Sequence, residues 1–149
     1  MNNKEIINKA RELAKSYKLQ GYHCSESIIR AVPKALDMEI SDDVIKAACG
    51  FFRGGGGTCD RCGVIECGLM LISTLYGRMD PDASDEKIEI LAEELVNRFT
   101  EKFGSIYCRI IKPNEVEKFG EEYGCMRTYE EGAEIVAQLL LDAPQLLAK

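Results

Sequence analysis

Long apolar runs are missing from this sequence. Its most apolar stretch, Gly68 to Leu75, includes Ser73 and Thr74 and falls far short of the roughly 20 residues that a helix needs to span a bilayer. Charged residues interrupt the amino-terminal segment, where a secretory signal would need an unbroken apolar stretch. The sequence therefore predicts no membrane span and no export, and we expect a cytoplasmic protein.

A surplus of basic residues is also missing. The chain has 19 Lys and Arg against 25 Asp and Glu, which gives a net charge of -6. Binding to a phosphate backbone relies on Lys and Arg that release counterions, so nucleic acid is not an expected partner. His23 is the only histidine, so a mixed Cys/His zinc site would have at most one imidazole. We expect His23 to be a surface residue at a helix start rather than a ligand.

The composition that remains is typical of a folded protein. Hydrophobic residues make up 46% and charged residues 30% of 149 residues, unlike the composition of disordered chains. A chain of this length buries one adequate core without splitting into two. We therefore expect residues 1–149 to form a single helical, cysteine-rich domain.

Apolar residues recur at helical spacing, and no stretch alternates for long enough to predict a strand. The pattern predicts an all-α bundle of five to six helices. The expected helices cover about residues 6–17, 24–36, 42–49, 62–76, 86–103 and 128–143, with two shorter pieces at 105–112 and 114–119. Nearly every residue of the 62–76 helix is apolar or small, so it is expected to be buried at the centre, and Pro144 is expected to end the last helix.

Seven cysteines are many for a protein in a reducing compartment. Ordinary pairs would stay reduced there, so several cysteines indicate metal ligation, catalysis or redox exchange. Cys49 and Cys67 lie within expected helices among apolar neighbours, and we expect them to be core residues.

Four cysteines share one sequence context, because Cys24, Cys62, Cys108 and Cys125 each stand at or near the expected start of a helix. Unpaired N–H groups and the helix macrodipole stabilise a thiolate at such a position. The sequence therefore predicts a lowered pKa for these thiols, which favours nucleophilic attack and metal ligation.

A run of four glycines precedes Cys62. Gly54, Gly55, Gly56 and Gly57 have no Cβ atoms, so their backbone can wrap around a bulky group and direct N–H groups at sulfur. We expect these glycines to bind a cofactor, and the alternative interpretation is a flexible surface loop.

Cys59-Asp60-Arg61-Cys62 is a C-x-x-C motif. Dithiol redox sites, zinc knuckles and iron-sulfur proteins all use this spacing. Gly63 follows in place of histidine, which excludes c-type haem attachment at this motif. Cys59 is left as a candidate additional metal ligand.

Several motifs stand in a particular order along the chain. They are Cys24-Ser25-Glu26, the glycine run, Cys62-Gly63-Val64-Ile65-Glu66-Cys67, Leu75-Tyr76-Gly77, Phe103-Gly104-Ser105-Ile106-Tyr107-Cys108-Arg109 and Cys125. In this order they resemble the C_GCAxxG_C_C family of redox-active proteins. The resemblance implies that the four characteristic cysteines of the family fall on Cys24, Cys62, Cys108 and Cys125.

The family is similar to the helical domain of split-Soret-type cytochromes, and this similarity implies cysteines that hold an iron-sulfur cluster. No haem-binding segment accompanies the domain here. The chain departs from the family pattern C-G-A-x-x-G with Val64 in place of alanine and Cys67 in place of the final glycine, and Cys59 adds the C-x-x-C. These departures imply a different site or an altered choice of ligand.

These features together predict a redox or electron-transfer protein. In this hypothesis Cys24, Cys62, Cys108 and Cys125 converge as ligands of an iron-sulfur cluster of the 2Fe-2S type. A redox partner protein follows from that role, and a homodimer is compatible with it.

Two alternatives stay open at this point. A metal-free thiol-disulfide protein would cycle Cys59 and Cys62, or Cys62 and Cys108, between dithiol and disulfide, with Cys62 and Cys108 as its redox residues. A structural zinc ion in an interaction module would involve no electron transfer.

Overall fold

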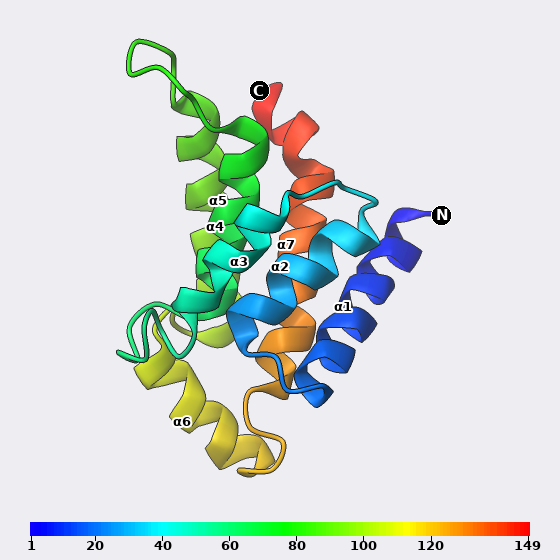
Figure 1. The fold of residues 1–149 in the computed structure, drawn as a ribbon, viewed down its shortest axis with the longest axis vertical. Helices are drawn as coiled ribbons and strands as arrows, with labels where there is room; N and C mark the ends of the chain where they lie inside the picture. The colour runs from blue at the N-terminus through cyan, green and yellow to red at the C-terminus, as the bar shows by residue number, and fades with distance from the viewer.

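The computed structural model describes residues 1–149 and contains seven α-helices, one 3-10 helix and no β-strand. The elements in chain order are α1 (Asn3–Leu19), α2 (Cys24–Ala35), α3 (Asp42–Ala47), η1 (Ala48–Phe51), α4 (Gly63–Tyr76), α5 (Glu86–Phe103), α6 (Cys108–Phe119) and α7 (Met126–Leu147). The all-α prediction is confirmed, although the chain forms seven α-helices where five to six were expected (Figure 1). None of them has the length and apolar character needed to cross a membrane.

Two prolines lie inside helices that were expected to stop at them. Helix α6 continues through Pro113, and α7 runs past Pro144 to Leu147. The expected separate pieces at 105–112 and 114–119 were therefore wrong, as was the expected end at Pro144. A proline removes one backbone donor but its fixed φ suits a helix. In α6 the carbonyl that loses its donor belongs to Arg109, which is exposed, so water can satisfy it.

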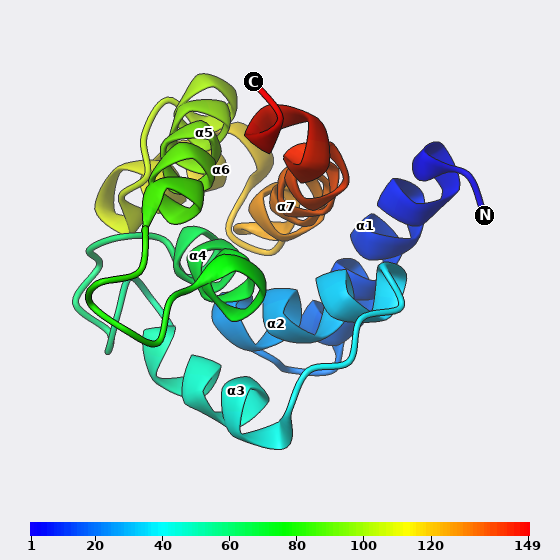
Figure 2. The same cartoon turned by 90° about the horizontal axis from the view of Figure 1, so that it is seen from above.

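The core lies between α1, α2, α4, α5 and α7. Helix α7 packs against α1, α2, α4 and α5, and α4 packs against α2, α5 and α7 (Figure 2). Most of α4 from Gly63 to Ile72 is buried, but Ser73 to Leu75 are exposed. The expected burial is thus found in the first part of α4. The packing is close, because a Cβ on Gly132 of α7 would lie 2.6 Å from Cγ1 of Val64.

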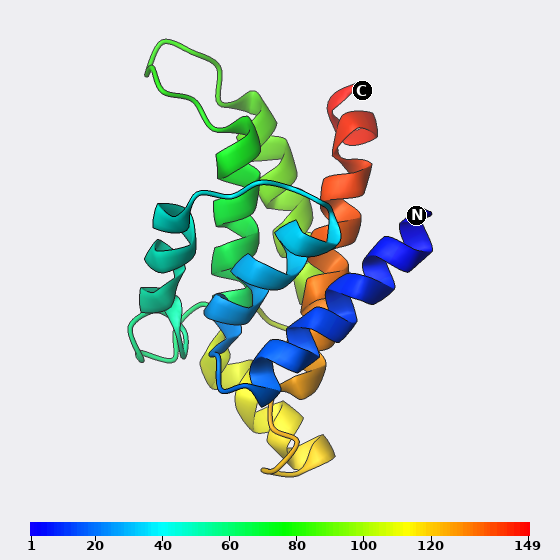
Figure 3. The same cartoon turned by 45° about the vertical axis from the view of Figure 1, so that its right-hand side comes forward.

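Several helices begin at the same end of the bundle. The amino-terminal ends of α2, α4 and α7 lie together there, and α6 crosses the same end (Figures 1 and 3). Within α6 only Ile111 and Glu115 are buried. This helix therefore packs on the bundle through one narrow side.

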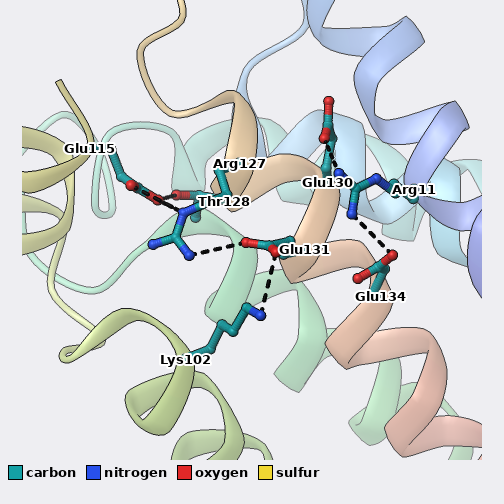
Figure 4. A network of polar contacts seen from close by, with 8 residues as sticks. All are labelled: Arg11, Lys102, Glu115, Arg127, Thr128, Glu130, Glu131 and Glu134. Carbon is teal, nitrogen blue, oxygen red and sulfur yellow. Dashed lines mark hydrogen bonds and ion pairs between the residues drawn. The ribbon is translucent and has the colours of Figure 1, made fainter. Parts of the chain in front are cut away.

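Ion pairs attach α7 to three neighbouring helices (Figure 4). Towards α1, Arg11 contacts Glu130 at 2.8 Å and Glu134 at 3.2 Å, and towards α5, Lys102 contacts Glu131 at 3.4 Å.

The third attachment joins α7 to α6. Arg127 contacts the buried Glu115 at 2.9 Å, and the Thr128 hydroxyl donates to the same carboxylate at 3.3 Å. Thr128 therefore binds α6 from within the first turn of α7, which begins two residues earlier at Met126.

Candidate functional site

The four cysteines singled out by the sequence all lie at helix starts. Cys24 and Cys108 are the first residues of α2 and α6, and Cys62 and Cys125 are the N-cap residues of α4 and α7. This part of the prediction is confirmed. All seven cysteines of the chain are free thiols.

These four residues, hereafter the cavity cysteines, line one cavity of about 270 Å³. Cys62 is buried, and Cys24, Cys108 and Cys125 are partly exposed. The cavity therefore lies where these four helices begin. The fold therefore brings together four sulfurs that are distant along the chain.

Backbone N–H groups surround the cavity sulfurs. The backbone N–H groups of Arg53, Ser25 and Gly63 lower the pKa of Cys24, and that of Val64 lowers the pKa of Cys62. Gly63 allows its backbone to come this close, because a Cβ there would lie only 2.5 Å from the Cys24 sulfur. The start of α4 is therefore shaped to approach Cys24.

The predicted direction of the pKa shift is wrong for all four thiols. Burial raises the pKa of Cys24, and it raises that of Cys62 well above the usual value, with the neighbouring Cys24 thiol adding to the rise. Burial likewise raises the pKa of Cys108, and that of Cys125 to about 11. The N–H groups at the helix starts do lower the pKa values of Cys24 and Cys62, but loss of solvation outweighs them. Without a cation, the cavity holds protonated thiols.

Cationic side chains also line this cavity. Lys18, Arg53 and Lys112 all contribute to its wall, with Glu121 as the one carboxylate. The Lys18 ammonium also lies 5.4 Å from the ring centroid of Tyr129, another wall residue. The cavity therefore presents more positive than negative side chains to whatever enters it.

Sequence reasoning missed these residues, although a signal existed for some of them. Lys112 and Tyr129 follow Cys108 and Cys125 by four positions, so each shares a helix face with its cysteine. Lys18 and Arg53 come from the end of α1 and from the glycine loop, and no local pattern points to them. His23 also lines the cavity and stacks on Phe52, with ring centroids 5.3 Å apart.

The cavity sulfurs do not close around a single point. No three His, Cys, Asp or Glu side chains are arranged to hold one metal ion. A tetrahedral thiolate site with bonds of about 2.3 Å would require sulfurs about 4 Å apart. The arrangement therefore lacks a preformed site for one ion, and the cavity has room for a larger group.

The glycine run forms a loop that folds back on itself. All four glycines have φ between 62° and 83°, a region that favours glycine. A Cβ on Gly54 would overlap the backbone of Asp60. None of the four lines the cavity, whose wall near this loop consists of Arg53 and Gly63. The expectation that Gly54, Gly55, Gly56 and Gly57 bind a cofactor stays a prediction.

The remaining three cysteines lie outside the cavity wall. Cys67 is fully buried and its thiol donates to the Ser25 carbonyl at 3.1 Å, so its expected core position is confirmed. The same expectation was wrong for Cys49, which is exposed because it belongs to the short η1 on the surface. Cys59 is exposed, and its thiol raises the pKa of Cys108.

These environments predict a marked order of alkylation in reduced, metal-free protein. Iodoacetamide should modify Cys49 and Cys59 first, because both are exposed. With a pKa of about 11, Cys125 has about one thiolate per thousand at pH 8, so its rate should rise about tenfold per pH unit above that. Peptide mapping by mass spectrometry after timed quenching checks the order. In urea all seven cysteines should react at similar rates, and equal rates in the folded protein would contradict the prediction.

The contact between Gly63 and Cys24 predicts a costly substitution. In Gly63→Ala the new Cβ would meet the Cys24 sulfur at 2.5 Å and the Phe51 carbonyl oxygen at 2.9 Å, and overpacking of this kind costs about 1 to 3 kcal/mol. Urea unfolding measures the loss. Gly50→Ala is the matched control, because a Cβ there meets nothing within 4 Å. Equal urea midpoints for both variants would show that the start of α4 has room for a Cβ at position 63.

Comparison with known proteins gives one match. The family model described as "Putative redox-active protein (C_GCAxxG_C_C)" matches residues 22–139. No curated protein and no solved structure matches the chain. The matched span runs from just before α2 into α7 and contains all four cavity cysteines.

Proposed function

The chain belongs to the C_GCAxxG_C_C family of redox-active proteins, and we propose that it is an electron-transfer protein whose four cavity cysteines bind an iron-sulfur cluster of the 2Fe-2S type. When bound, such a cluster accepts and donates single electrons. The observation that carries the proposal is the shared cavity, which gathers one sulfur from each of four helix starts.

The donor set suits this group. Four cysteine thiolates are the ligands of ordinary 2Fe-2S clusters, and the cavity of about 270 Å³ exceeds what one ion needs. Gly63 keeps the wall beside Cys24 free of a side chain. Because each ligand begins or caps a helix, the helices fix the positions of the ligands better than mobile loops would.

Charge also supports a bound cationic metal group with thiolate ligands. The thiols are protonated at neutral pH because burial raises their pKa values, and metal binding deprotonates ligating thiols outright. Lys18, Arg53 and Lys112 then offset the negative charge that four thiolates bring. Protonated thiols are poor nucleophiles, so the same facts give less support to the cavity cysteines as metal-free redox catalysts.

The zinc alternative receives less support than the cluster. One zinc ion would require all four sulfurs to close to about 4 Å from each other, whereas no such group exists in this structure. A two-iron cluster spaces its ligands more widely and requires less closure.

Anaerobic purification with metal analysis tests the proposal. We expect about two iron and two acid-labile sulfide ions per chain, with visible absorption that bleaches on reduction by dithionite. A chain that holds neither iron nor sulfide, even after anaerobic reconstitution, would contradict the proposal. Zinc without visible absorption would support the structural zinc alternative instead.

A further inference from the structure

The C-x-x-C motif and the start of α6 run side by side in opposite directions. The N–H of Cys108 donates to the Asp60 carbonyl at 2.7 Å, and the N–H of Arg109 donates to the Cys59 carbonyl at 3.0 Å. Next to these bonds, Arg61 and Tyr107 form the isolated antiparallel bridge. The backbone therefore places Cys59 beside Cys108, although they are 49 positions apart in the sequence.

Side-chain contacts strengthen this juxtaposition. The Arg109 guanidinium pairs with the Asp60 carboxylate at 3.0 Å. The Cys59 thiol lies close enough to raise the pKa of Cys108. The partner of Cys59 is therefore Cys108, and not Cys62 of its own motif, which lies buried in the cavity wall.

Cys59 has an unusual backbone conformation. Its φ is 58°, in the left-handed region that a non-glycine residue adopts only at some cost. Its N–H donates to the Arg53 carbonyl at 2.8 Å, so the folded glycine loop holds it in that conformation. Cys59 is exposed to solvent, whereas Cys108 lies at the cavity. The pair thus links the surface to one of the cavity cysteines.

We propose that Cys59 and Cys108 form a reversible disulfide when a low-molecular-weight disulfide oxidises the metal-free protein, and that this bond withdraws Cys108 from the cavity. The disulfide would then prevent cluster binding under oxidising conditions. The second half of this inference rests on the proposed cluster function, and the first half does not.

The reaction is an ordinary thiol-disulfide exchange. The Cys59 thiolate attacks one sulfur of the small disulfide, which forms a mixed disulfide and releases one small thiol. Cys108, a protonated thiol at neutral pH, then loses its proton to water, and the thiolate that forms attacks the Cys59 sulfur and expels the second small thiol. Two protein thiols lose two electrons and two protons in total, and the small disulfide is reduced to two thiols.

Peptide mapping of metal-free protein treated with oxidised glutathione tests the pairing. Trypsin cuts after Arg53 and Arg61 and after Lys102 and Arg109, so Cys59 and Cys108 fall in separate peptides, 54–61 and 103–109, each with one cysteine. Under non-reducing conditions we expect these two peptides to be joined as the main protein disulfide, and dithiothreitol to separate them. Cys59 that stays joined to glutathione, or is joined to the 62–78 peptide, would overturn the inference.

Matched variants test the consequence. Oxidation should lower iron loading of the wild type at least about tenfold, which is the scale expected when a metal site is disturbed, and dithiothreitol should restore it. Cys59→Ser should load equally with or without prior oxidation, whereas Cys49→Ser, which removes another exposed cysteine, should behave as wild type. Loading of Cys59→Ser that falls as in the wild type would overturn the inference.

The two proposals fail in different ways. If no variant binds iron while peptides 54–61 and 103–109 become joined, the cluster function is wrong and the pairing of Cys59 with Cys108 stands. If reduced protein binds iron but the two peptides are never joined, the inference is wrong and the cluster function stands.

Discussion

Cys62→Ala should reduce iron and sulfide content by more than about tenfold. Altering a residue that merely supports a metal ligand already costs about tenfold, and loss of the ligand itself should cost more. Cys62 caps α4 and lies buried in the cavity wall, where its neighbours are Cys24, Cys108 and Cys125. No other sulfur can replace it without moving a helix, because Cys67 is turned towards the Ser25 carbonyl at 3.1 Å. Iron and sulfide analysis after anaerobic reconstitution measures the loss.

Cys67→Ala is the control for this substitution. It removes a buried sulfur from the same helix, but Cys67 lies outside the cavity wall. We expect iron and sulfide content within about twofold of wild type and a loss of stability of about 1 kcal/mol, typical of one lost hydrogen bond. Unchanged loading in Cys62→Ala, or equal losses in both variants, would exclude Cys62 as a ligand.

Arg127→Ala should cost about 3 kcal/mol of unfolding free energy. Only 2% of the Glu115 side chain is exposed, and Arg127 contacts it at 2.9 Å. Removing the guanidinium leaves a buried carboxylate without its cation, which is among the most destabilising changes a side chain can produce. Urea unfolding measures the effect. Because Glu115 lies on α6 and Arg127 on α7, hydrogen exchange should also accelerate in α6, which carries Cys108.

Two further variants make the Arg127 prediction specific. Arg78→Ala removes an exposed ion pair with Asp85, at 3.7 Å, and two exposed hydrogen bonds to the Pro81 and Ala83 carbonyls, both at 2.8 Å. Water can replace these bonds, so the substitution should cost less than about 1 kcal/mol. Combining Arg127→Ala with Glu115→Ala should recover part of the loss, since the unpaired carboxylate is then gone. A similar cost for Arg127→Ala and Arg78→Ala would show that the buried pair of Glu115 and Arg127 stabilises the protein no more than an exposed ion pair does.

Local patterns were sufficient to find most of the helix ends. Ser41 caps α3 by accepting from the Val44 N–H, and Gly104 ends α5 in the left-handed conformation. Such signals act over a few residues and are visible in the sequence. The same signals placed Cys24, Cys62, Cys108 and Cys125 at helix starts, which is where the structure has them.

Local patterns gave wrong predictions wherever the outcome depends on residues that are distant along the chain. Cys49 has apolar neighbours in the chain but faces solvent. Pro113 did not divide α6, and the buried Glu115 of that helix pairs with Arg127 of α7. The pKa values of the cavity cysteines are raised because burial removes water from the thiols.

The sequence by itself determined the helical class, most helix boundaries and the position of four thiols at helix starts, because capping and periodicity are properties of neighbouring residues. Only the tertiary structure decided that these starts meet at one cavity, that Lys18 and Arg53 join its wall, and that Cys59 lies beside Cys108. The burial of these thiols and the charges near them depend on which helix ends lie together in the folded protein. A pattern of neighbouring residues in the sequence does not contain that information.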